Sequence, residues 1–293
     1  MRETIWRHVR LALPDDWEML QFSRAADRGR CVFADRYEYR LELDWQAAPA
    51  RPDLTRTISD YASVLRADPA VAAVTPAEHG GWCGLVSTAK ADGTAVARFG
   101  NWLAAAELLT EIVFIWPAGR RDERTERRVL TSTSAVPPDA DGRRRWRAFG
   151  LDMRVATELE LTECQAQPAR TRLRFAPPPG RGPRQEQCFE RLGMAEQWLR
   201  RPVPEWLRLR LPVSFRVRSQ ESLTVSGHEV TRLRGDCPEH GWRRLLGRRA
   251  AFTAQAWTCP GDGRVCAALE IGVPAPAERR PSLRCDDWAG GGV

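Results

Sequence analysis

Thiol and imidazole side chains toward the C-terminal end are the residues of this chain best suited to chemistry. Cys237 and His240 have the spacing of the first two ligands of a zinc site, in which thiolate sulfur and imidazole nitrogen bind the ion. Cys259 and Cys266 follow, with an Asp-Gly pair between them. A two-residue hairpin turn at that pair would place the two cysteines opposite each other, with Trp257 on the same face. Together they are candidate ligands of a Cys₃His zinc site: Cys237, His240, Cys259 and Cys266.

A simpler interpretation of these thiols stays open. The chain has no Cys-x-x-Cys pair, and Cys259 and Cys266 are far apart for a zinc knuckle, so they could instead be two small side chains that fill a cross-strand position. His228 is isolated in sequence and is expected to be structural or at the surface. Its neighbour Glu229 cannot act with it as an acid–base pair, because adjacent strand residues point to opposite faces. No cofactor other than zinc is indicated.

A second candidate surface is an arginine-rich stretch at residues 198–219, in which Glu205 is the only acid. Arginine alternates with apolar residues there, which predicts strands with exposed arginines and with Leu209, Phe215 and Val217 inside. Such a basic stripe could bind phosphates or an acidic protein surface. A solvated sheet face, neutralised by acids on neighbouring strands, is the alternative. The candidate partner- or anion-binding residues are Arg200, Arg201, Arg208, Arg210, Arg216 and Arg218.

Composition limits the classes of protein to consider. The 293 residues suit two domains, and the net charge of +7 comes from 45 basic against 38 acidic residues, with Lys90 the only lysine. This charge permits an anionic partner without requiring one. We expect no membrane insertion, because no apolar run is long enough to span a bilayer. The N-terminal segment does not resemble a signal peptide, so the eight cysteines are expected to be reduced thiols in the cytoplasm.

Catalytic motifs are missing from the sequence. It contains no Gly-x-Ser-x-Gly elbow, no Walker loop and no His-Glu-x-x-His. A non-enzyme is therefore favoured, although an enzyme whose site is assembled from dispersed residues stays open.

Secondary-structure patterns indicate the elements that would position these residues. Strict alternation over Tyr37–Trp45 predicts a strand with one wet face. Helical spacing of apolar residues predicts a helix over Thr57–Leu65, with Asp53 or its first residue as the N-cap. A second helix is expected over Phe189–Leu199. The segment Asn101–Leu109 fits either a short helix or half of a hairpin.

Short matches in a common order divide the chain into two similar halves. Trp6 corresponds to Trp146, and Arg30 and Phe33 fall opposite Arg172 and Phe175. We therefore expect an α+β fold with two pseudo-repeated antiparallel-sheet domains, each carrying one or two helices. The Pro-, Gly- and Arg-containing linker chemistry near residue 140 sets the boundary. The expected parts are residues 1–138, 139–275 and a flexible tail at 276–293.

Most of the first half resembles a known fold family, and the second half resembles it more faintly. The residues involved are Leu13-Pro14-Asp15-Asp16-Trp17-Glu18, a strand through Cys31-Val32-Phe33, a helix near Tyr61 and a closing strand at Arg128–Ser132. Together they resemble the PsbP/Mog1-like (DcrB-type) α/β/α sandwich. The resemblance implies a role for this chain in binding, because members of that group are mostly non-enzymatic accessory or assembly factors, and some bacterial relatives are chaperones for secreted effectors.

The leading functional hypothesis is therefore a non-catalytic binding protein that acts as an adaptor, assembly factor or chaperone of a larger complex, with a protein as its partner. The alternative is an RNA- or DNA-binding component that uses the arginine-rich sheet face.

Overall fold

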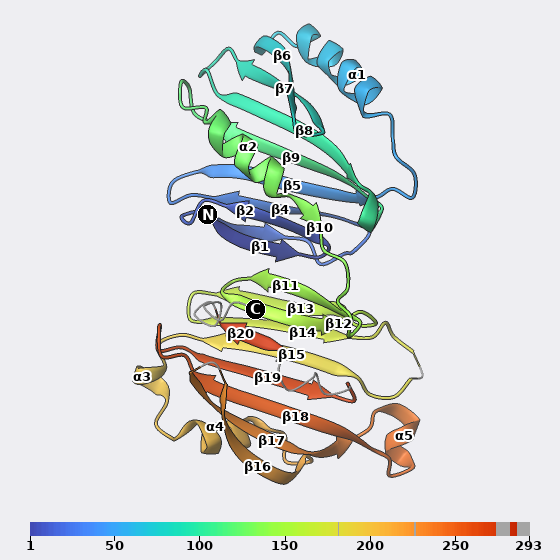
Figure 1. The fold of residues 1–293 in the computed structure, drawn as a ribbon, viewed down its shortest axis with the longest axis vertical. Helices are drawn as coiled ribbons and strands as arrows, with labels where there is room; N and C mark the ends of the chain where they lie inside the picture. The colour runs from blue at the N-terminus through green and yellow to red at the C-terminus, as the bar shows by residue number, and fades with distance from the viewer. Residues whose placement is uncertain (181, 226, 274–281, 286–293) are drawn as a thin grey trace. The chain divides into compact units, whose positions relative to one another are not determined.

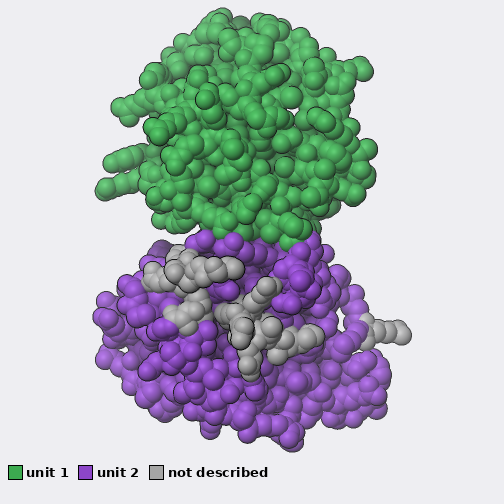
Figure 2. Space-filling model, in the orientation of Figure 1, with its two compact units in different colours: residues 1–137 green, residues 138–293 purple. Residues whose placement is uncertain are grey.

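The computed structural model describes residues 1–180, 182–225, 227–273 and 282–285. The protein consists mostly of antiparallel strands with few helices (Figure 1). It divides into two compact units, Met1–Pro137 and Pro138–Val293, which Figure 2 distinguishes by colour. The division falls one residue before the boundary expected from the linker chemistry.

Unit 1 contains a seven-stranded antiparallel sheet in the order β3-β4-β5-β9-β8-β7-β6. Its strands are β3 (Glu18–Phe22), β4 (Arg28–Ala34), β5 (Tyr39–Ala47), β6 (Val71–His79), β7 (Trp82–Ala89), β8 (Ala95–Leu103) and β9 (Leu108–Trp116). In a smaller sheet, β2 (Val9–Leu13) lies between β1 (Arg2–Trp6) and β10 (Ser134–Ala135). The segment expected as a helix or a hairpin is the turn of the β8–β9 hairpin, which contains the 3₁₀ helix η1 (Ala104–Ala106).

The core of unit 1 lies on one face of the large sheet. The alternation predicted over Tyr37–Trp45 is confirmed for Leu41, Leu43 and Trp45, which are buried on this face. It is wrong at its start, because Tyr37 precedes β5 and Tyr39 is exposed. Helix α2 (Glu123–Ser132) packs against the same face, where the indole nitrogen of Trp82 donates to the carbonyl of Leu130 at 3.0 Å.

The closing strand expected at Arg128–Ser132 is wrong, because these residues are the end of helix α2. Asp122 caps the helix by accepting hydrogen bonds from the backbone nitrogens of Arg124 and Thr125, each at 3.0 Å. The buried residues Glu126, Val129 and Leu130 have the spacing of one helical face.

Helix α1 (Leu54–Ala67) packs against the other face of the large sheet. Asp53 caps it, as expected, by accepting from the backbone nitrogen of Arg56. Leu54 lies against Gly100, which faces the side of the sheet opposite to Trp82. The two helices of unit 1 therefore lie on opposite faces of one sheet.

Replacing Asp122 with alanine is expected to lower the free energy of unfolding of unit 1 by about 0.5 to 2 kcal/mol, the usual effect of losing an N-cap. Backbone and side-chain hydrogen bonds from Thr125 hold the pKa of Asp122 below its usual value. The contribution of this carboxylate is therefore present above the unfolded pKa of about 3.9 and is lost as the pH falls through the folded pKa. Urea unfolding at neutral and acidic pH measures this effect.

The difference between wild type and Asp122→Ala should shrink at acidic pH. Asp16→Ala, at an exposed site outside the helix, is the control and should change little at either pH. A difference that stays equal at both values would contradict the proposed role of the Asp122 charge.

Unit 2 has a seven-stranded antiparallel sheet in the order β13-β14-β15-β19-β18-β17-β16. Its strands are β13 (Glu160–Gln167), β14 (Arg170–Ala176), β15 (Glu186–Leu192), β16 (Arg216–Val225), β17 (His228–Pro238), β18 (Arg249–Thr258) and β19 (Val265–Ile271). In the smaller sheet, β12 (Leu151–Ala156) lies between β11 (Arg143–Ala148) and β20 (Leu283–Cys285). The helices are α3 (Ala195–Trp198), α4 (Val203–Arg210) and α5 (Gly241–Leu245).

The two large sheets have the same strand order, since each strand of unit 1 has a counterpart ten places later in unit 2. Side chains correspond as well. Arg30 pairs with Asp44 on the neighbouring strand, and Arg172 pairs with Glu190 in the equivalent register. That the two units superpose stays a prediction.

Two expectations for unit 2 are wrong. The helix expected over Phe189–Leu199 is replaced by the end of strand β15 and the four-residue helix α3. The apolar side chains there fit a strand, because Phe189 of β15 pairs with Leu173 of the neighbouring strand β14. The tail expected from residue 276 to 293 is not flexible throughout, because Leu283–Cys285 forms strand β20 and pairs with β12. Residues 276–281 and 286–293 lie outside the described part of the chain.

Candidate functional site

The hairpin between β18 and β19 does not have the expected register. Cys266 lies opposite Trp257, and Cys259 lies opposite Arg264 rather than opposite Cys266. The loop therefore spans four residues, Pro260–Gly263, with Gly263 at a φ of +65°. Proline fixes its own φ near −65°, which suits the second position of a turn, so the turn begins at Pro260 and not at the Asp-Gly pair. Cys259, Cys266 and Trp257 still share one face of the sheet.

The four expected zinc ligands do not converge. Cys237 is buried on the opposite face of the sheet, where it packs with Leu207, Leu233 and Phe252. His240 is exposed at the N-cap of α5. Strand β17 continues in regular pairing with β18 from Thr231 to Pro238, so the alternation of side chains keeps Cys237 away from the face that carries Cys259 and Cys266.

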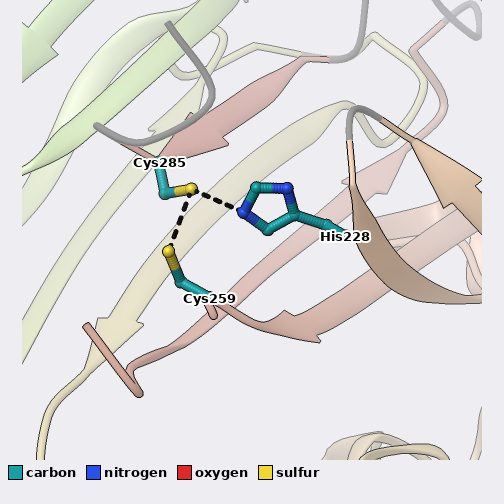
Figure 3. Close-up of side chains that lie close together, drawn as sticks. All are labelled: His228, Cys259 and Cys285. Carbon is teal, nitrogen blue, oxygen red and sulfur yellow. Dashed lines mark hydrogen bonds between the residues drawn. The ribbon is translucent and has the colours of Figure 1, made fainter. Parts of the chain in front are cut away.

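A different group of ligand atoms comes together on that face (Figure 3). The sulfur of Cys285 lies 3.1 Å from the Nε2 atom of His228 and 3.4 Å from the sulfur of Cys259. The three ligand atoms all lie within 4.8 Å of one another, and all three residues are buried. We call these three residues the thiol–imidazole cluster.

Each member of the cluster comes from a different element. His228 is the first residue of β17, Cys259 directly follows β18, and Cys285 ends β20. Pairing of Cys285 with Leu151 in β12 fixes its position. The imidazole of His228 also makes an edge contact with the indole ring of Trp257, with the ring centroids 6.3 Å apart. Sheet pairing and aromatic packing thus hold the cluster from several sides.

A further thiol, Cys266, lies beside the cluster. Burial raises the pKa of Cys266 well above its usual value, and the neighbouring thiols of Cys285 and Cys259 add to this effect. Arg191 lies opposite Cys266 in strand β15 and opposes the rise. Cys266 is therefore a neutral thiol in the absence of a bound cation.

Sequence reasoning missed two members of this cluster for different reasons. Cys285 lies in the segment assigned to a flexible tail, and its partners are distant in sequence. His228 is isolated in sequence. It comes near Cys259 and Cys285 only because its strand, β17, pairs with β16 on one side and with β18 on the other. Isolated cysteine and histidine residues give no spacing signal, because sheet topology alone determines which of them meet.

Only part of the arginine-rich stretch lies on a strand. Arg208 and Arg210 belong to helix α4, so the expected strand there is wrong, and Leu209 is 65% exposed instead of buried. Pro202 and Pro204 favour the start of a helix, and Leu207 is the residue of α4 that is buried against β17 and β18. Arg216 and Arg218 project from β16 as expected, with Phe215 and Val217 partly buried between them.

Acidic side chains neutralise half of the arginine candidates. Arg201 pairs with Glu205, Arg210 with Glu190 and Arg218 with Asp236. Arg208 donates instead to the amide oxygen of Gln220 at 3.0 Å. These residues do not form one continuous stripe of free positive charge, which weakens the case for a nucleic-acid surface.

The sheet face beside the start of α4, which includes the edge strand β16, carries a groove of about 510 Å³. Its walls come from the start of α4, the second half of β16, the start of β17 and the β18–β19 loop. Strand β16 is the last strand of the sheet, so its outer backbone groups have no partner strand within the described residues. Its lining residues include Val203, Ser222, Leu223, Thr224, Glu229 and Thr231.

The cluster and the groove are close along the chain. Gly227 and Glu229 line the groove on either side of His228, and Thr258 and Pro260 line it on either side of Cys259. Residues adjacent in a strand point to opposite sides of the sheet. The segments that hold the cluster therefore also form part of the wall of the groove.

Comparisons with known proteins identify no family. No family model matches the chain, and no curated protein matches it. Among solved structures, an immunity protein, TplEi, of the T6SS from Pseudomonas aeruginosa shares 11% identity over 97% of this chain and 91% of its own, with a TM-score of 0.36. A protein from Bacteroides thetaiotaomicron VPI-5482 shares 10% identity over 53% of each chain, with a TM-score of 0.31. The second match spans about half of that protein. Likenesses this weak do not bear on function.

None of the helices in the described ranges is long and apolar enough to cross a membrane.

Proposed function

We propose that this protein is a non-catalytic binding protein, an adaptor, assembly factor or chaperone, that holds an extended segment of a protein partner in the groove beside β16. The groove itself carries the proposal. Its volume of about 510 Å³ is within the range of specific binding sites, and it lies next to a strand edge that can pair with an added strand.

The lining of the groove suits a polypeptide segment better than a nucleic acid. Its described residues are mainly hydroxyl-bearing and aliphatic, and Glu229 is the one charged residue among them. A carboxylate repels phosphate and attracts a basic side chain or an amino group. The expected occupant is therefore an extended segment with small apolar and hydroxyl side chains and one basic residue.

The same lining supports a role in binding rather than in catalysis. Among the lining residues that the structure describes, Glu229 is the one titratable side chain, so no paired acid and base face the groove. The cysteine and histidine side chains of the neighbouring cluster are buried and do not line the groove.

We also infer that the two units are tandem copies of one fold. The shared strand order and the equivalent pairs Arg30–Asp44 and Arg172–Glu190 support this inference. The resemblance of the first half to the PsbP/Mog1-like group stays a prediction, and its expected closing strand at Arg128–Ser132 is part of helix α2. The cytoplasmic location stays a prediction.

A displayed library of random peptides, selected against the full chain, tests the groove. Ser222 is an exposed residue of β16 in the groove lining, and Ser222→Arg would fill the site. We expect this variant to bind the selected peptides at least about tenfold more weakly, a change of about 1.4 kcal/mol. Ser219→Arg makes the same substitution at an exposed residue of the same strand outside the lining, and it should leave the affinity unchanged.

Both variants should keep the wild-type melting temperature, because both sites are exposed. Selected peptides that bind the two variants equally well, or a selection that yields no peptide, would refute the groove as the binding site.

A further inference from the structure

The thiol–imidazole cluster has the donor set of a closed metal site. Two cysteine sulfurs and one histidine Nε2 atom lie within 4.8 Å of one another, and each residue is buried. Zn–S bonds of about 2.3 Å and Zn–N bonds of about 2.0 Å place the ligands of a tetrahedral zinc ion roughly 3.5 to 4 Å apart. The two separations that involve Cys285, 3.1 and 3.4 Å, require an opening of a few tenths of an ångström, and the ligand atoms of His228 and Cys259 lie within 4.8 Å of each other.

Charge balance also favours a divalent cation at this place. Two thiolates and a neutral imidazole carry a charge of −2, which one Zn²⁺ ion cancels. A neutral complex avoids the large cost of burying net charge. Binding would release the two thiol protons to solvent, and a third proton if Cys266 also binds as a thiolate.

We propose that His228, Cys259 and Cys285 bind one Zn²⁺ ion, with the neighbouring thiol of Cys266 as the candidate for the fourth ligand position. The ion is structural, because all three ligands are buried and no ligand faces the groove. This site is independent of the proposed binding function.

The zinc ion would hold strand β20 in the fold. This strand has three residues, and within the described part of the chain it pairs with β12 alone. Near it, Ser282 donates a hydrogen bond to Glu270 at 2.9 Å, and Cys285 contacts His228 and Cys259. Metal ligation would turn the contacts of Cys285 into bonds to β17 and to the segment after β18, and so couple zinc binding to the folding of unit 2.

A disulfide between Cys259 and Cys285 is the competing outcome. Their sulfurs are 3.4 Å apart, whereas a disulfide bond is about 2.05 Å long, so the bond would require both sulfurs to move together. It would also leave the Nε2 atom of His228 without its thiol partner and would require an oxidant.

Elemental analysis of the full chain, purified without a histidine tag or chelator, tests the proposal. We expect about one zinc ion per chain. The variants Cys259→Ser, Cys285→Ser and His228→Gln should each lose most of the zinc. Cys237→Ser changes a buried cysteine on the other face of the same sheet and should retain zinc at the wild-type level.

A second measurement covers the case in which a ligand variant does not fold. Wild-type protein reconstituted with Co²⁺ should show the intense visible absorption of tetrahedral Co²⁺ and the ultraviolet charge-transfer band of a cobalt–thiolate bond. Added Zn²⁺ should remove both signals. A strong chelator should lower the melting temperature of the zinc protein, and added zinc should restore it.

Three results would overturn the proposal. The first is a wild-type protein that binds neither zinc nor cobalt. The second is a Cys259–Cys285 disulfide found by mass spectrometry in freshly purified protein. The third is a loss of zinc in Cys237→Ser that equals the loss in the ligand variants. Failure of the peptide selection would not affect this result, so the two proposals can be judged separately.

Discussion

Replacing Glu270 with alanine is expected to lower the free energy of unfolding of unit 2 by about 3 to 5 kcal/mol, the usual effect of breaking a buried ion pair. The side chains of Glu270 and Arg143 are each only 5% exposed, and their charged atoms lie 3.2 Å apart. Glu270 also accepts hydrogen bonds from Gln187 at 2.6 Å and from Ser282 at 2.9 Å. The substitution would remove the carboxylate that faces the buried guanidinium of Arg143, and it would take one acceptor each from Gln187 and Ser282.

Urea unfolding followed by tryptophan fluorescence and circular dichroism measures this change. Glu160→Ala removes an exposed carboxylate of the same unit and should change stability by less than about 0.5 kcal/mol. Glu270→Gln keeps the size of the side chain and an acceptor oxygen, so its effect should lie between those of the other two variants. An effect of Glu270→Ala no larger than that of Glu160→Ala would show that Arg143 finds another partner or reaches water.

Unit 1 contains a similar buried ion pair, between Glu126 and Arg121. The side chain of Glu126 is completely buried, and its carboxylate accepts from the indole nitrogen of Trp116 at 2.7 Å and from two guanidinium nitrogens of Arg121 at 3.0 and 2.8 Å. We expect Glu126→Ala to destabilise unit 1 by close to 3 kcal/mol, near the lower end of the roughly 3 to 5 kcal/mol range for breaking a buried pair. The lower end applies because Arg121 is 24% exposed and can turn toward solvent.

Glu123 provides a matched control for this second substitution. It pairs with the same arginine at 3.0 Å from the same helix, but its side chain is 59% exposed. Glu123→Ala should therefore cost less than about 1 kcal/mol. Equal effects of the two substitutions would mean that attraction to Arg121, and not burial of the carboxylate, determines the stability of this end of α2.

Local sequence patterns predicted those parts of the fold in which the pattern fits only one kind of secondary structure. The alternation at Leu41, Leu43 and Trp45 allows only a strand, and the cap at Asp53 begins helix α1 as expected. The alternation of leucine and arginine in residues 207–210 was misleading. Over four residues, a period of two cannot be distinguished from the spacing of a helix that buries only Leu207. The proline residues before it were the better evidence.

The candidate site was harder to predict than the fold elements. A zinc site with ligands close in sequence has a recognisable spacing, but the thiol–imidazole cluster brings together residues separated by 31 and 26 positions along the chain, from 228 to 259 and from 259 to 285. The expected turn at Asp262-Gly263 was a strong signal, yet Pro260 moved the register of the hairpin by two residues and separated Cys259 from Cys266. Which thiols meet depends on pairings that become visible only in the complete sheet.

The order of the elements along the chain has a consequence for folding during synthesis. The last strand of unit 1, β10, ends at Ala135, so this unit has all of its strands before most of unit 2 has been made. Unit 2 spans Pro138–Val293, which takes roughly 10 to 30 s to translate at about 5 to 20 residues per second. Its strand β20 is made after all seven strands of its large sheet. A ribosome-bound chain therefore carries all the strands of unit 1 for seconds while unit 2 still lacks strand β20 and Cys285. At this stage we expect unit 2 to be most exposed to proteases and chaperones.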